Sequence, residues 1–201
     1  MKDLDRAYLR ATAAQIQVAA DGDTGKTLKG YAALFNDPWD VFDFKRRVAP
    51  GAFAASLQSD RSVAALFNHD DNIILGRSKD AGNLELAEDA KGLAFTLKLS
   101  DDHWSEYVSK LVADKRITQM SFGWMTISDA WSQNGDDIVQ TILEVDLWEV
   151  SPVTFPANPN TTVSLATAAA FRAFREKLDP TVAAQLGADE ARLTETDLRL
   201  G

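Results

Sequence analysis

The sequence predicts a mainly β protein, a closed antiparallel β-barrel with surrounding helices. Three observations carry this prediction. Short segments rich in β-branched and aromatic residues recur between clusters of Gly, Pro, Asn and Asp over the first 165 residues. The two longest of these segments are joined through Asn134-Gly135, the strongest short hairpin signal in the chain. One segment only, at 100–115, interrupts them with clear helical spacing. Many short strands with frequent turns are typical of a barrel or a sandwich.

The expected strands follow one another along the chain. Residues 15–20 and 27–35 flank the turn cluster Asp21-Gly22-Asp23-Thr24-Gly25, which predicts a hairpin. A third strand is expected at 41–48, where Pro50-Gly51 ends it, and a short helix follows at 52–57. Further strands are expected at 62–67, 84–86, 93–99, 118–131 and 138–153. Pro152, Pro156 and Pro159 are expected to end regular pairing.

The segment 100–115 is predicted to be an amphipathic helix. Ser100 is the expected N-cap, and acidic residues follow it in the first turn, where the helix dipole favours negative charge. The apolar residues recur at helical spacing: Trp104, Tyr107, Val108, Leu111 and Val112.

The composition changes near residue 165. We therefore expect a barrel domain over 1–165 and an Ala-rich, charged helical tail over 166–201, with a first helix from about 164 to 178. Phe171, Phe174 and Leu178 form one apolar stripe on that helix, which is typical of a packing or partner-binding face rather than of a chemical site.

Composition also excludes several classes of protein. The formal net charge of −9 and the pI near 4.7 argue against a nucleic-acid binder and against a polybasic membrane contact. The absence of cysteine excludes disulfides, thiolate metal sites and cysteine nucleophiles. A reducing cytoplasm fits this absence. No stretch has the length of a membrane span, and the charged first ten residues do not resemble a signal peptide.

Glu149 is the first of three candidate site residues. Leu143, Val145 and Leu147 alternate along one expected strand face, and Glu149 continues that series. A carboxylate in line with core positions needs a partner, because burying an unpaired charge is costly. The alternative is a bulge or a strand end that leaves Glu149 exposed.

His69 and Ser121 complete the candidate set. His69 follows the apolar strand face of Val63, Ala65 and Phe67, and either catalysis or a structural pairing with Asp70 and Asp71 would explain it. Ser121 points away from the apolar face made by its neighbours on the expected strand, and the alternative is an ordinary solvent-facing serine. A hydroxyl, an imidazole and a carboxylate are the groups needed to activate a serine nucleophile.

Five motifs in a fixed order bring in a resemblance: GYAALFN, RVAPGAF, FNHD, QMSFGW and LWEVSPVTFPANP. Between about Gly30 and Val163 the chain resembles the HK97-type phage prohead (capsid maturation) serine proteases, which are related in fold to the herpesvirus assemblins. The resemblance implies a barrel with surrounding helices, His69 as catalytic base, Ser121 as nucleophile and Glu149 as third member of the triad. Phe122 and Trp124 depart mildly from the commonest family forms.

The resemblance also implies a substrate and a place of action. The substrate is the scaffolding segment of the major capsid protein, and the protease itself through autocleavage, inside the assembling prohead in the host cytoplasm. No cofactor, nucleic acid or membrane is expected. The herpesvirus relatives gain activity by dimerisation, so a homodimer stays open.

Two other functions stay open at this point. One is a catalytically inactive capsid-assembly or scaffold-binding module on the same barrel. The other is a metal-dependent hydrolase that uses His69, Asp70, Asp71 and His103, whose spacing matches no metal motif.

Overall fold

The computed structural model describes residues 16–18, 27–41, 43–135 and 137–154. The chain divides into two compact units, 1–162 and 163–201, and the described residues all lie in the first. The helix expected at 164–178 and its apolar stripe therefore lie outside the described residues. The described part contains ten strands and two helices.

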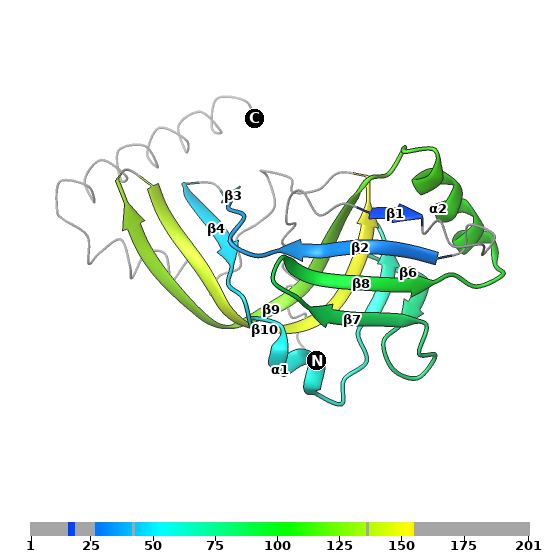
Figure 1. Ribbon diagram of the computed structural model, residues 1–201, viewed down its shortest axis with the longest axis horizontal. Coiled ribbons are helices and arrows are strands. Elements are labelled where there is room, and N and C mark those ends of the chain that lie inside the picture. The colour runs from blue at the N-terminus through cyan, green and yellow to red at the C-terminus, as the bar shows by residue number, and fades with distance from the viewer. Residues whose placement is uncertain (1–15, 19–26, 42, 136, 155–201) are drawn as a thin grey trace, which may run out of the picture. The chain divides into compact units, whose positions relative to one another are not determined.

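The first sheet has four antiparallel strands in the order β1-β2-β8-β7. These are β1 (Ile16–Val18), β2 (Thr27–Leu34), β7 (Leu84–Glu88) and β8 (Gly92–Lys98). Figure 1 shows β2, β8 and β7 running side by side. The strands match the expected positions because apolar side chains alternate along them, with Leu93, Phe95 and Leu97 all buried.

The second sheet is built around one long hairpin, β9 (Gln119–Asn134) and β10 (Asp137–Val153). Gly135, between the two strands, has a φ of 61°, the left-handed conformation that made Asn-Gly a hairpin signal. Along its other edge, β10 pairs with β4 (Phe44–Val48) and then with β5 (Ala64–Phe67). β3 (Trp39–Val41) extends the sheet beyond β4, and β6 (Asp70–Arg77) extends it beyond β5.

The closed antiparallel β-barrel predicted from the sequence is wrong. Both sheets are open, and β10 pairs with β4 and with β5 in parallel. Between the sheets the backbone N–H of Ile16 donates to the carbonyl of Thr118 at 3.2 Å, ahead of β9, but no ladder continues the pairing. Alternation and turn residues are local signals, whereas closure depends on whether distant strand edges meet.

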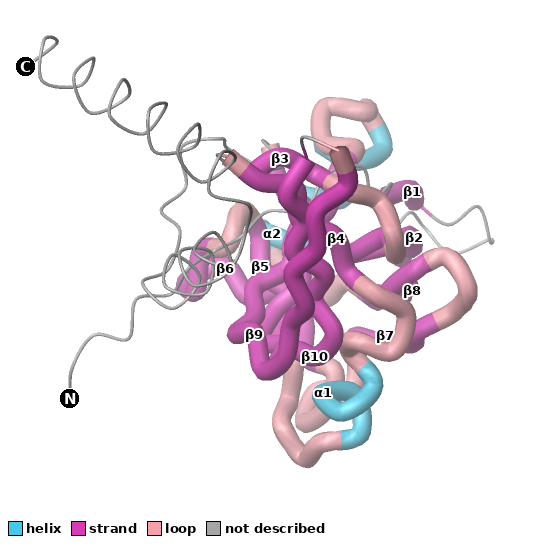
Figure 2. Tube along the Cα trace, turned by 90° about the vertical axis from the view of Figure 1, so that its left-hand side faces the viewer, coloured by secondary structure: helices cyan, strands magenta, loops and turns pink. Residues whose placement is uncertain are grey.

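A short helix fills the gap that β4 and β5 leave along the edge of β10. This helix, α1 (Ala54–Gln58), lies beside β10 in Figure 2. The buried Ser56 hydroxyl donates to the carbonyl of Val145 at 2.6 Å and accepts from the N–H of Leu147 at 2.8 Å. The N–H of Val145 donates to the carbonyl of Ala52 at 3.0 Å. Backbone groups of β10 thus find partners where no strand reaches them.

The second helix, α2 (His103–Ala113), confirms the helical spacing but not the expected cap. Asp102, not Ser100, is the N-cap, and its carboxylate accepts from the Ser105 N–H at 2.9 Å. Hydrogen bonds from the side chain and the backbone of Ser105 hold the pKa of Asp102 below its usual value. Val108, Leu111 and Val112 are buried. Neither α1 nor α2 has the length and apolar composition that a membrane-crossing helix needs.

The core of the described unit contains a chain of aromatic rings. Phe53 is fully buried, with its ring centroid 5.4 Å from that of Phe122 and 6.2 Å from that of Phe35. Phe122 in turn stacks on Trp124 at 4.4 Å. These contacts pack Phe53, just before α1, against β9 of the second sheet and against Phe35, just after β2.

Phe53→Ala is expected to lower the free energy of unfolding by about 3–5 kcal/mol, because it removes buried apolar surface and leaves a cavity. The measurement is the midpoint of urea unfolding at unchanged m-value. Leu143→Ala is the control. Its side chain is exposed, so it should change stability by about 0.5 kcal/mol or less. Equal midpoint shifts in the two variants would contradict the assignment of Phe53 to the core.

Candidate active site

His69 lies in a two-residue turn between β5 and β6. Phe67 and Asp70 are the last paired residues of this hairpin, and Asn68 and His69 both have positive φ, at 54° and 61°. A tight hairpin turn of the I′ type requires positive φ at both central residues. Asn and His are among the few non-glycine residues that adopt this conformation with any frequency. The turn therefore fixes the place of the imidazole relative to β5.

Asn68 ties this turn to the end of β10. Its backbone N–H donates to the carbonyl of Pro152 at 3.0 Å. Its side-chain oxygen accepts from the Thr154 N–H at 2.8 Å, and its amide nitrogen donates to the Thr154 hydroxyl at 3.2 Å. Pro152 is itself paired within β10, so the expectation that it ends regular pairing is wrong. The three hydrogen bonds bring the next residue, His69, beside β10.

Glu149 reaches the same place through a β-bulge. Leu147 pairs with Trp124 and Glu149 pairs with Gly123, so Trp148 is the extra residue. The bulge puts Glu149 on the opposite sheet face from Leu147, and the predicted core row from Leu143 to Glu149 is therefore wrong. Leu143 lies at another register shift and is 43% exposed. Glu149 is nevertheless only 4% exposed, so the bulge re-aims the carboxylate without exposing it.

The carboxylate of Glu149 contacts two side chains. Its Oε1 lies 2.6 Å from Nδ1 of His69, and its Oε2 accepts from the hydroxyl of Ser151 at 2.5 Å. Because an ionised carboxylate only accepts, Nδ1 is the donor in the first contact. A Cβ at Gly123 would lie 2.5 Å from Oε1. The absence of a side chain at Gly123 is therefore what makes room for the carboxylate.

Ser121 lies on the same face, across from Ser151. The two residues are paired in the β9–β10 register and both are fully buried. Within the described part of the chain the Ser121 hydroxyl makes no hydrogen bond, so it is not hydrogen-bonded to His69. The structure thus brings His69 and Glu149 into contact and places Ser121 on their sheet face. A buried hydroxyl without a partner is rare and calls for an explanation.

Two of the other residues weighed from the sequence, His103 and Asp70, have contacts of their own. His103 is exposed at the start of α2, with its ring 5.3 Å from that of Trp104. Asp70 is exposed and accepts from the backbone and the side chain of Asn72, which hold its pKa below the usual value. Among residues 16–18, 27–41, 43–135 and 137–154, no group of three or more His, Asp or Glu side chains could hold a metal ion.

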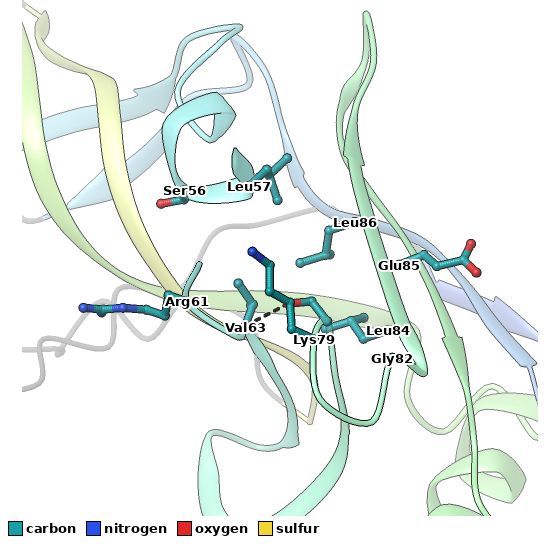
Figure 3. Close-up of a pocket in the computed structure, with 10 residues that line it drawn as sticks. Ser56, Leu57, Arg61, Val63, Lys79, Gly82, Leu84, Glu85 and Leu86 are labelled. Carbon is teal, nitrogen blue, oxygen red and sulfur yellow. Dashed lines mark hydrogen bonds between the residues drawn. The ribbon is translucent and has the colours of Figure 1, made fainter. Parts of the chain in front are cut away.

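A cavity of about 270 Å³ lies on another part of the molecule, between α1 and β7 (Figure 3). Leu57, Val63, Leu84 and Leu86 line it, and none of the three candidate site residues does. Its two basic side chains already have partners. Arg61 pairs with Asp146 at 2.7 Å, and the Lys79 ammonium donates to the carbonyl of Ser59. The cavity is therefore not assigned to the site.

Sequence reasoning missed the roles of Ser151 and Asn68 and did not predict β6. A usable signal existed for Ser151, because residues two apart on a strand share a face and Glu149 precedes it by two. No comparable signal existed for Asn68, whose partners lie some 85 residues further along the chain.

Comparison with known proteins gives one match. The family model described as Caudovirus prohead serine protease matches residues 14–176, which is most of the chain and includes every element of the site. No curated protein and no solved structure matches.

Proposed function

The chain belongs to the Caudovirus prohead serine protease family, and we propose that it hydrolyses peptide bonds through a triad of Ser121, His69 and Glu149. The single observation that carries the proposal is the buried 2.6 Å contact between Nδ1 of His69 and Oε1 of Glu149. An acid that holds one imidazole nitrogen as the donor leaves the other nitrogen to act as the base.

The proposed reaction is acyl transfer in two steps. Nε2 of His69 takes the hydroxyl proton of Ser121 while the oxygen bonds to the peptide carbonyl carbon. The C–N bond then breaks, and His69 returns the proton to the leaving amine. A water molecule, deprotonated by the same imidazole, hydrolyses the acyl-enzyme. Glu149 holds the tautomer and stabilises the imidazolium that forms in each step.

Ser121 is the better nucleophile of the two serines on this face. The hydroxyl of Ser151 donates its proton to the carboxylate of Glu149, so a base cannot take that proton without breaking a charge-assisted hydrogen bond. The hydroxyl of Ser121 has no such bond. Its contact with His69 is expected to form when substrate binds, because catalytic hydrogen bonds are often long or absent in the unliganded state.

The proposed substrates follow from the family and not from the geometry. The family is named for the prohead, and capsid maturation fits that name. We take the scaffolding segment of the major capsid protein as the substrate, with self-cleavage as a second reaction, inside the assembling prohead. The net charge of −9 is compatible with a protein held in a shell before DNA enters.

Labelling with a fluorophosphonate probe tests the nucleophile directly, because such probes react with activated serines only. Wild-type protein is expected to gain one probe mass on the peptide that carries Ser121, and His69→Ala is expected to gain none. Co-expression with the capsid protein and intact-mass measurement tests the substrate. Labelling at Ser151 would overturn the assignment. An unlabelled, folded wild type with intact capsid protein would favour the inactive assembly module instead.

A further inference from the structure

Ser151 is a buried polar residue that the proposed reaction does not use. It is fully buried on β10, it is paired in register with Ser121, and it follows Glu149 by two residues on the same sheet face. Its hydroxyl donates to Oε2 of Glu149 at 2.5 Å. This is a short, charge-assisted hydrogen bond in a site from which water is largely excluded.

Each carboxylate oxygen of Glu149 thus has its own donor. Oε1 accepts from His69 and Oε2 accepts from Ser151. Two donors on opposite oxygens fix the rotation of the carboxylate plane, and Oε1 is thereby kept in line with Nδ1. Without the Ser151 hydroxyl, Oε2 would be a buried carboxylate oxygen that has lost its donor.

We propose that Ser151 is a positioning residue of the peptidase, which holds the carboxylate of Glu149 in the orientation that contacts His69. The proposal rests on the proposed triad. Loss of the Ser151 hydroxyl frees the carboxylate to rotate away from Nδ1 of His69. The imidazole is then held less well during proton transfer, so kcat falls while KM changes little.

Asp70 and Asp71 follow His69 directly and are exposed. The partners of Glu149 and Ser151 on β9 are Gly123 and Ser121, and Glu149 also pairs with Ala64 of β5. None of these three strand partners carries a charge. Substitution of Ser151 therefore removes a hydroxyl donor to the carboxylate without changing the charge of the site.

The test compares four variants by their kcat and KM for a peptide substrate. Ser151→Ala is expected to lower kcat by about 10- to 100-fold, the loss of one hydrogen bond to a charged group, with little change in KM. Ser151→Thr keeps the hydroxyl, and Ser151→Val matches the shape of threonine without the hydroxyl. Thr is expected to keep a kcat near that of the wild type, and Val is expected to lower kcat as Ala does.

Ser56→Ala is the matched control. It removes another buried serine that hydrogen-bonds to β10, but to backbone groups of Val145 and Leu147 instead of the carboxylate. It is expected to lower the melting temperature and leave kcat unchanged.

Failure of the proposed triad and failure of the positioning role give different results. Wild-type cleavage that does not depend on Ser121 would sink the proposed triad. Cleavage that depends on Ser121, with equal kcat values for Ser151→Thr and Ser151→Val, would overturn the positioning role alone. The Thr and Val pair keeps the test decisive if Ser151→Ala folds poorly.

Discussion

Ser121→Ala is expected to reduce peptide cleavage by about 10⁶-fold, the loss seen when a serine protease loses its nucleophile. The variant should fold at least as stably as the wild type. The Ser121 hydroxyl is fully buried and makes no hydrogen bond among the described residues, so its removal ends the cost of burying an unsatisfied polar group. Loss of activity with equal or higher stability is the signature of a group kept for function.

The measurement pairs a cleavage assay on capsid precursor with thermal unfolding of the same preparations. Ser128→Ala is the control, because Ser128 lies on the same strand and is exposed. It should leave both rate and melting temperature unchanged. Cleavage by Ser121→Ala at a rate near that of the wild type would remove Ser121 as the nucleophile, and a large drop in its melting temperature would show a structural role instead.

Gly123→Ala is expected to lower kcat by about 10²- to 10⁴-fold, the upper end being the effect of losing the acid's contact with the histidine. The new Cβ would lie 2.5 Å from Oε1 of Glu149 and 3.1 Å from its Cδ and Cγ. A flexible side chain can move away, so the fold should survive. That movement, however, breaks the contact with His69 that the triad requires.

The measurement is the kcat of Gly123→Ala alone and in a Glu149→Gln background. The added methyl should have little further effect in that background, because both substitutions act on one contact. Gly82→Ala is the control. A Cβ there meets nothing within 4 Å, and the positive φ of 63° makes the change strained without touching the site. A Gly123→Ala enzyme with wild-type kcat would show that the Glu149 contact does not matter for the chemistry.

The local elements of the fold were predictable because their causes are local. Asn134-Gly135 predicted the hairpin of β9 and β10, since only a residue that tolerates positive φ closes such a turn cheaply. Apolar residues at helical spacing predicted α2, because a helix needs one apolar face to pack. The mainly β character followed in the same way. The motifs predicted the family, and the family match confirms it.

The open edges of the two sheets and the parallel pairing of β10 were not predictable in this way. β4 and β5 lie on one edge of β10, separated by α1, and pairs such as Glu149 with Ala64 join residues far apart in sequence. No run of alternating residues records which distant edge a strand will meet. The bulge at Trp148 is similar, because strict alternation placed Glu149 beside Leu147, and only the register against β9 reveals the extra residue.

For the candidate site, too, the sequence and the tertiary structure determined different features. By itself the sequence narrowed the choice of catalytic base, because it has no cysteine and two histidines, and the resemblance to the family implied Ser121 and Glu149 as the partners of His69. Only the tertiary structure decided the other three features. A β-bulge puts Glu149 on the opposite sheet face from Leu147, hydrogen bonds of Asn68 hold the His69 turn beside β10, and Ser151 donates a hydrogen bond to the Glu149 carboxylate. The reason is physical. Residue type sets what a group can do, whereas a contact of 2.6 Å across 80 residues is set by packing and register.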